Sequence, residues 1–127
     1  MAGGAVIVAG FGFRGAATAA SLRDALERTG RAAQVRLLAT AADKAGTAAF
    51  RGLAADLGLP VQGVDSALLA DQQTPTRSVA SMAARGTGSV AEAAALAAAG
   101  PGARVLVSRR ISADGMATCA LAERKDG

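Results

Sequence analysis

Three glycines near the amino terminus stand at the spacing G-x-G-x-x-G. Gly10, Gly12 and Gly15, with Arg14 before the last of them, follow an apolar run and precede a helical pattern. Glycines in this context let backbone N–H groups approach an anion at the positive end of a helix. The next predicted strand ends in alanine and threonine, without the acidic residue that holds a ribose hydroxyl in dinucleotide sites. The glycines therefore indicate a tight turn or a general anion site, and not an NAD site.

A second polar segment, TAADK, lies where the second predicted strand meets the second helix. Its Thr40, Asp43 and Lys44 offer a hydroxyl, a carboxylate and an ammonium group. In a parallel sheet this junction shares the carboxyl edge with the glycines, and that edge is the usual place for a ligand. Two interpretations stay open. Either the segment recognises a polar ligand, or Asp43 caps the helix and Lys44 is solvated.

The turn G-T-G-S, at 86–89, is the third candidate site. Thr87, Gly88 and Ser89 come directly before a helix, whose free N–H groups and dipole favour an anion. Ser89 and Glu92 also form the S-x-x-E pattern of a capping box, which explains the same residues without a ligand. Arg109, at the end of a later strand, either lines the same edge or is solvated.

The missing residue types exclude several chemistries. The chain has no His, Trp or Tyr and a single cysteine, Cys119. A Ser-His-Asp triad, a His-ligated zinc site and an internal disulfide are therefore excluded, and stacking on single-stranded nucleic acid is disfavoured. Cys119 is interpreted as a small buried thiol and not as a nucleophile, because no histidine is present to activate it. We expect no metal and no cofactor.

Charge and hydropathy limit the classes of partner that the protein is expected to bind. The net charge is +4, and 12 of the 14 basic residues are arginines spread along the chain. Scattered arginine disfavours a nucleic-acid partner, whereas an arginine binds a carboxylate or a phosphate through two parallel hydrogen bonds. No run approaches the roughly 18 apolar residues of a membrane span, and the amino-terminal stretch is typical of a buried strand. We expect a cytoplasmic protein with an anionic small-molecule ligand and no membrane partner.

Apolar runs and helical spacings alternate along all 127 residues, which predicts one α/β domain over 1–127. Strands are predicted at 5–9, 35–39, 61–64, 104–108 and 116–122. Helical patterns are predicted at 22–29, 50–57, 66–70, 78–85 and 90–97, and a loop at 71–76. The last two strands flank the short loop ISADG, as in a hairpin. The pattern predicts a three-layer domain with a mixed, mainly parallel sheet and a C-terminal β-hairpin.

The order of these segments resembles the CobE proteins and the C-terminal domain of CbiG, a family of cobalamin biosynthesis. The matching segments cover nearly the whole chain: GFGFRGAAT, LLATAADKAG, LAADLGLPV, GTGSVAEAAALAAAG and RVLVSRRISADGMATCALA. The length resembles the stand-alone CobE type. The resemblance implies a role in making the corrin ring of vitamin B12, whose precorrin intermediates are macrocycles ringed with acetate and propionate groups.

The chain departs from the family pattern at three places. Phe13 stands where a cysteine is common, Ala45 and Gly46 stand where an acidic pair often occurs, and Arg109 replaces a frequent lysine. By the resemblance, these changes weaken the case for acid–base catalysis and leave ligand binding intact.

Three hypotheses follow. In the first, the protein binds a precorrin or hydrogenobyrinic-acid-type polycarboxylate intermediate at the carboxyl edge of the sheet. Arg14 and the backbone of 10–15 would bind one carboxylate, Thr40 and Lys44 a second, and residues 87–89 a third. In the second, it is a hydrolase of the same pathway, like the CbiG proteins that open the ring A lactone of cobalt-precorrin-5A, with Asp43 or Glu92 as general base. In the third, the glycine loop binds a nucleotide phosphate. The sequence leaves open whether the protein turns over its ligand, whether it forms a homodimer and whether it contacts other enzymes of the pathway.

Overall fold

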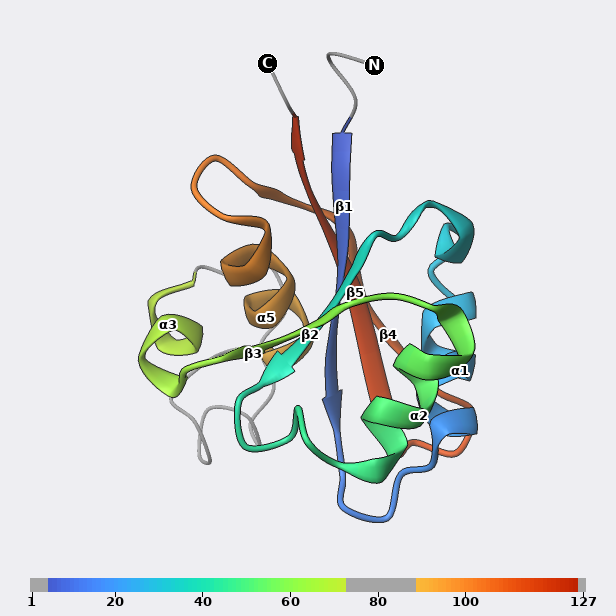
Figure 1. Cartoon of the computed structure of the whole chain (residues 1–127). Coiled ribbons are helices and arrows are strands. Elements are labelled where there is room, and N and C mark those ends of the chain that lie inside the picture. Colours follow the sequence, from blue (N-terminus) through green and yellow to red (C-terminus); the bar gives the residue numbers. More distant parts are fainter. Residues whose placement is uncertain (1–4, 73–88, 126–127) are drawn as a thin grey trace.

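The computed structural model describes residues 5–72 and 89–125 (Figure 1). The strands are β1 Ala5–Phe13, β2 Leu37–Ala41, β3 Val61–Val64, β4 Arg104–Ile111 and β5 Ala117–Lys125. The helices are α1 Ala19–Glu27, α2 Ala48–Leu57, α3 Ser66–Asp71 and α5 Val90–Ala99, with a 3₁₀ turn at Ala32–Gln34. The helix predicted at 78–85 and most of the loop predicted at 71–76 lie outside the described residues.

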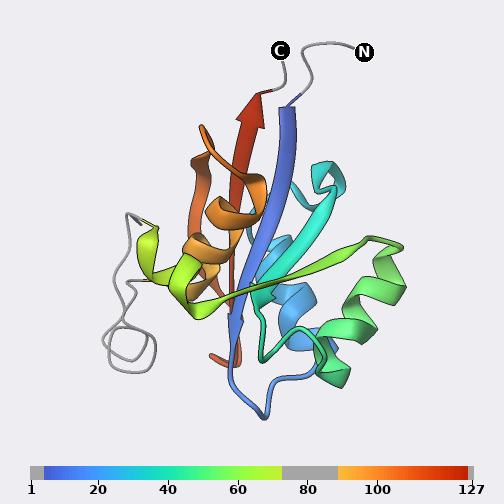
Figure 2. The same cartoon turned by 60° about the vertical axis from the view of Figure 1, so that its left-hand side comes forward.

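The strands form one sheet in the order β3-β2-β1-β5-β4. The β1–β2 and β2–β3 pairs are parallel, whereas β5 runs antiparallel to both β1 and β4. Four of the five described strands therefore point the same way. The β4–β5 hairpin lies at one side of the sheet, with β4 as the edge strand. Helices α1 and α2 cover one face, and α3 and α5 cover the other (Figures 1 and 2). The predicted three-layer fold with a mixed sheet is confirmed.

The two faces of the sheet are packed with side chains of different size. On the α1 and α2 face the buried residues are large, among them Phe11, Leu22, Phe50 and Leu53. On the α5 face the buried layer consists largely of alanines from the helix and of small residues from the strands. Because side-chain size sets the distance between layers, the alanine helix lies closer to the sheet.

Strand β1 continues through the first two glycines, where the sequence predicted a loop. Gly10 pairs with Ala39 on one side and with Ala120 on the other. A Cβ atom added to Gly10 would lie 2.0 Å from the carbonyl oxygen of Ala91 and 2.5 Å from the backbone nitrogen of Ala95. The prediction of a strand ending at residue 9 was wrong, because this glycine admits a helix backbone against the strand and makes no turn.

The hairpin turn between β4 and β5 is tied to the start of α1 by the carboxylate of Asp114. It accepts hydrogen bonds from the hydroxyls of Ser112 and Ser21 and, at 3.0 Å, from the backbone N–H of Met116. These bonds, with the Ser112 bond the largest contributor, lower the pKa of Asp114 to about 2. Ser21 also belongs to a capping box with Thr18 that opens α1. The turn and the helix start therefore form one polar unit.

We expect Gly10→Ala to lower the free energy of unfolding by about 3 kcal/mol or more, because the added methyl group meets the α5 backbone. Urea unfolding followed by far-ultraviolet circular dichroism measures this change. Gly15→Ala is the matched control, since nothing lies within 4 Å of a Cβ atom there, and its effect should stay within about 1 kcal/mol. Equal unfolding midpoints for the two variants would contradict the close contact.

The Asp114 contacts also predict a pH dependence of stability. The pKa of this carboxyl group falls from 3.8 to about 2 on folding, so its contribution is present above pH 4 and is lost as the pH falls from about 4 to about 2. Urea midpoints measured across this range should decline less in Asp114→Asn than in the wild type. Asp65→Asn, whose side chain does not cap its helix, should decline as the wild type does. A parallel decline in all three proteins would refute the proposed role.

Candidate functional site

Charged residues from two chain connections and from the end of one strand reach one edge of the sheet. This edge holds the carboxyl ends of β1, β2 and β4, in the lower part of Figure 1. Arg14 follows β1, Lys44 follows β2, and Arg109 lies near the end of β4. The β4 end is level with the β1 end, because Ile111 and Gly12 both pair with Thr118 of β5. We call this region the carboxyl edge.

Helix α5 begins at the same edge. A Cβ atom added to Gly12 would lie 3.3 Å from the Cβ of Val90 and 3.7 Å from the backbone nitrogen of Ala91. The helix cap, Ser89, is buried and accepts a hydrogen bond from the N–H of Glu92 at 3.2 Å. The predicted capping role of Ser89 is therefore confirmed, whereas Thr87 and Gly88 lie outside the described residues.

Lys44 is the best-defined cation of the carboxyl edge. Its ammonium nitrogen lies 5.2 Å from the centroid of the Phe13 ring. The ring in turn stacks on Phe50, with centroids 6.1 Å apart and planes inclined by 13°. A cation at this distance from an aromatic face is attracted by the ring quadrupole. The sequence indicated Lys44 but gave no sign of its aromatic partner, because residues 13 and 44 meet only through the pairing of β1 with β2.

Arg14 and Gly15 lie exposed in the connection after β1. The backbone N–H of Arg14 donates to the carbonyl of Met116 at 2.9 Å, which fixes the chain as it leaves the sheet. Among the predicted glycines, only Gly15 lies in the turn between β1 and α1. The motif therefore does not form the phosphate loop that a nucleotide site requires, since two of its three glycines are strand residues.

Two other predicted contact residues have roles inside the protein. Thr40 is fully buried, and its hydroxyl donates to the carbonyl oxygen of Phe11 at 2.8 Å. Gly10 is buried under α5 as described above. Packing and internal hydrogen bonding account for both residues.

These features can be compared with known proteins. The family model described as cobalamin synthesis G C-terminus matches residues 7–122 of the chain. The chain belongs to this family. The crystal structure of CobE, from the cobalamin biosynthetic pathway, is 34% identical, with 100% of this chain and 96% of that chain covered and a TM-score of 0.87. The resemblance to CobE and to the CbiG C-terminal domain is confirmed, and the chain is a cobalamin biosynthesis protein of this type.

Two further solved structures share the architecture. The cobalamin biosynthesis protein ChiG from Agrobacterium tumefaciens str. C58 is 34% identical, with 92% of this chain and 97% of that chain covered and a TM-score of 0.66. A cobalamin biosynthesis protein G homolog from Sulfolobus solfataricus is 17% identical, with 93% and 36% covered and a TM-score of 0.68, and supports the fold alone. No curated protein matches the chain.

The two carboxylates suggested as general bases occupy different environments in this CbiG-type domain. Asp43 is exposed in the turn after β2. It does not cap α2, as one interpretation had it, because the cap residue is Thr47. Glu92 is fully buried, and its Oε2 accepts a hydrogen bond of 2.9 Å from the backbone N–H of Arg109.

The Glu92 contact falls at an irregularity of β4. The register against β5 shifts between Val107 and Arg110, which marks a β-bulge, and Arg109 lies within it. A bulge leaves a strand residue without its ladder partner. The buried carboxylate supplies an acceptor for the Arg109 N–H. The S-x-x-E spacing predicted that Glu92 helps to cap its own helix, but it did not indicate this bond to β4.

Other groups in the described part of the chain lie away from this edge or inside the core. Cys119 is fully buried, and burial raises the pKa of its thiol well above the usual value. No cluster of three His, Cys, Asp or Glu side chains within 5–72 and 89–125 could hold a metal ion. None of the helices in these ranges is long and apolar enough to cross a membrane.

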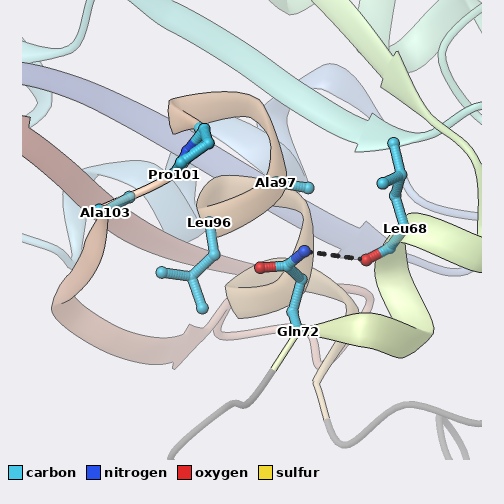
Figure 3. A pocket seen from close by; sticks show the side chains of 8 residues that line it. Leu68, Gln72, Leu96, Ala97, Pro101 and Ala103 are labelled. Atoms are coloured by element: carbon cyan, nitrogen blue, oxygen red, sulfur yellow. Dashed lines mark hydrogen bonds between the residues drawn. The ribbon is translucent and has the colours of Figure 1, made fainter.

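An open hollow of about 300 Å³ lies beside α3 and the carboxyl end of α5 (Figure 3). Leu68, Leu96 and Pro101 are among its lining residues, and Gln72 donates to the carbonyl of Leu68 at 3.1 Å. The hollow is at the other end of α5 from Ser89 and shares no residue with the carboxyl edge. It therefore does not belong to the candidate site.

We expect Glu92→Ala to lower the free energy of unfolding by about 1–3 kcal/mol, because the Arg109 N–H loses its acceptor. Glu92→Gln should cost less, since its amide oxygen can still accept this bond. Chemical unfolding at pH 7 measures both, with exposed Glu27→Ala on α1 as the control. If Glu92→Ala and Glu27→Ala unfold at the same midpoint, the structural role is wrong.

Proposed function

We propose that this cobalamin biosynthesis protein binds a polycarboxylate tetrapyrrole intermediate of corrin ring synthesis at its carboxyl edge. The observation that supports the proposal is that Arg14 and Lys44, in two different connections, and Arg109, near the end of β4, come to one edge of the sheet. A macrocycle ringed with acetate and propionate groups presents several carboxylates around one plane. Cations on separate elements match such a ligand better than a single clustered anion site would.

The chemistry of the three cations suits carboxylates. A guanidinium group binds a carboxylate through two parallel hydrogen bonds, whereas an ammonium acts as a compact point charge. Each charged hydrogen bond contributes about 1.5–3 kcal/mol. Two or three such contacts together contribute about 3–9 kcal/mol, against which the cost of association is set.

A hydrolytic step is the second candidate, and the exposure of Asp43 favours this residue over Glu92 as its base. Asp43 lies next to Lys44 in the turn at the carboxyl edge. Glu92 is buried and bonded to the β4 backbone. If the wild type converts a bound intermediate, the variant Asp43→Asn therefore tests whether Asp43 is the base.

We expect hydrogenobyrinic acid, a coloured polycarboxylate of this chemistry, to bind the wild-type protein stoichiometrically. Visible absorbance reports the ligand alone, because unmodified protein side chains do not absorb visible light. Arg14→Ala and Lys44→Ala should each weaken binding about tenfold, the effect of one charged hydrogen bond. Lys125→Ala is the matched control, since Lys125 is exposed and pairs with Ala5 at the opposite edge.

Mass spectrometry of the pigment separates binding from catalysis. An unchanged mass at equimolar protein supports a binding role, and a changed mass at substoichiometric protein that disappears in Asp43→Asn supports the hydrolase. Absence of binding, or an equal loss in Lys125→Ala, would overturn the assignment of this edge.

A further inference from the structure

The Lys44 side chain is held at both of its ends before any ligand arrives. At the backbone, its N–H donates to Ala41 at 2.8 Å, and its carbonyl accepts from the N–H and the hydroxyl of Thr47 at 3.1 and 2.8 Å. At the other end the ammonium group lies over the Phe13 ring. A lysine fixed in this way has already lost much of the rotamer freedom that ligand binding would otherwise remove.

The ring under the ammonium is itself anchored in the core. Phe13 is half-buried and stacks on Phe50. Phe50 is fully buried and meets Phe11 edge-on, with centroids 5.8 Å apart. These three residues are all the aromatic residues of the chain. They form a column that runs from the centre of the α1 and α2 core to the carboxyl edge and ends at the ammonium of Lys44.

We propose that Phe13 is a positioning residue, which holds the Lys44 ammonium ready to receive a ligand carboxylate. This inference rests on the proposed function, because it concerns the same anion site. The ring face attracts the ammonium without using a strong hydrogen-bond acceptor, so the N–H groups that point away from the ring remain able to bind a carboxylate. Preorganisation of this kind improves affinity by reducing the entropy lost on binding.

The alternative use of Phe13 is as a flat surface on which the macrocycle itself stacks. In that case the ligand would displace the ammonium, and removal of Lys44 would leave binding unchanged or stronger. The two roles therefore make opposite predictions for Lys44, and the position of the ammonium over the ring favours the first.

A double-mutant cycle tests the positioning role with hydrogenobyrinic acid as the probe. We expect Phe13→Leu to weaken binding about three- to tenfold, and Phe13→Tyr, which keeps the ring, to bind like the wild type. In a Lys44→Met background, Phe13→Leu should have no further effect, because the ring acts through the ammonium. Phe11→Leu controls for loss of core packing, and Lys125→Met controls for loss of charge. Unfolding midpoints are measured for every variant.

Nuclear magnetic resonance of the free protein provides a measurement independent of the ligand. The chain has two lysines, Lys44 and Lys125, so their side-chain signals are easily assigned. The ring current of Phe13 should move the Hε signals of Lys44 upfield from those of Lys125, and Phe13→Leu should abolish the difference. Identical Hε shifts in the wild type would overturn the positioning role whatever the ligand does.

The outcomes distinguish this inference from the function on which it rests. If the wild type binds, Lys44→Met weakens binding and Phe13→Leu does not, only the role of Phe13 is wrong. If Phe13→Leu weakens binding equally with and without Lys44, the ring contacts the ligand itself and the positioning role is again wrong. If the wild type does not bind the pigment, the proposed function fails, and the role of Phe13 toward a carboxylate fails with it.

Discussion

The close contact of α5 with β1 at Gly10 determines how the rest of the α5 face is built. With no side chain at this position, the helix backbone lies against the strand. Only alanine-sized residues then fit in the layer between them, which explains the run of alanines in α5. The same contact fixes the beginning of the helix near the end of β1, and places Glu92 where its carboxylate reaches the backbone of β4. The absence of a side chain at Gly10 therefore determines where α5 begins and how its Glu92 contacts β4.

The α1 and α2 face is packed with larger side chains, and it contacts a different part of the carboxyl edge. Its large side chains keep α1 and α2 farther from the sheet, and leave room for the column of three phenylalanines that ends under Lys44. The hairpin turn is fastened to α1 on this face through Asp114, close to the connection that carries Arg14. The two faces therefore support different cations: the α5 face supports Arg109 through a buried carboxylate, and the α1 and α2 face supports Lys44 through aromatic rings.

Much of this architecture could be predicted from the sequence. Periodicity located α1, α2, β3 and the final hairpin, because each combines an apolar spacing with a clear stop such as Gly58. The second strand begins two residues later than predicted, since Val35 ends a 3₁₀ turn and Arg36 bonds to Ile7 before the strand pairs. The end of β1 was predicted wrongly, because the sequence does not distinguish a glycine that admits a helix backbone from a glycine that makes a turn.

The candidate site was only partly predictable for a related reason. The positions of Arg14, Lys44 and Arg109 at one edge follow from the parallel strand order, which the alternation of strands and helices indicates. The partners of these residues do not follow from it. The pairing of Lys44 with Phe13 depends on the register of two strands, and the bond from Arg109 to Glu92 depends on a bulge in a third. A bulge changes which backbone groups lack a partner without changing the apolar pattern, so periodicity does not detect it.

The environments of the charged groups bear on the function proposed for the carboxyl edge. The carboxylate that lies deepest, Glu92, is bonded to the backbone of β4, and the exposed carboxylate, Asp43, lies beside a lysine whose ammonium is held over a ring. A general base needs access to its proton and a pKa near the working pH. Cations need only fixed positions and accessible N–H groups. The aromatic contact of Lys44 and the buried contact of the Arg109 backbone fix the chain at two of the cations, which agrees with the proposed binding of an anionic ligand at this edge.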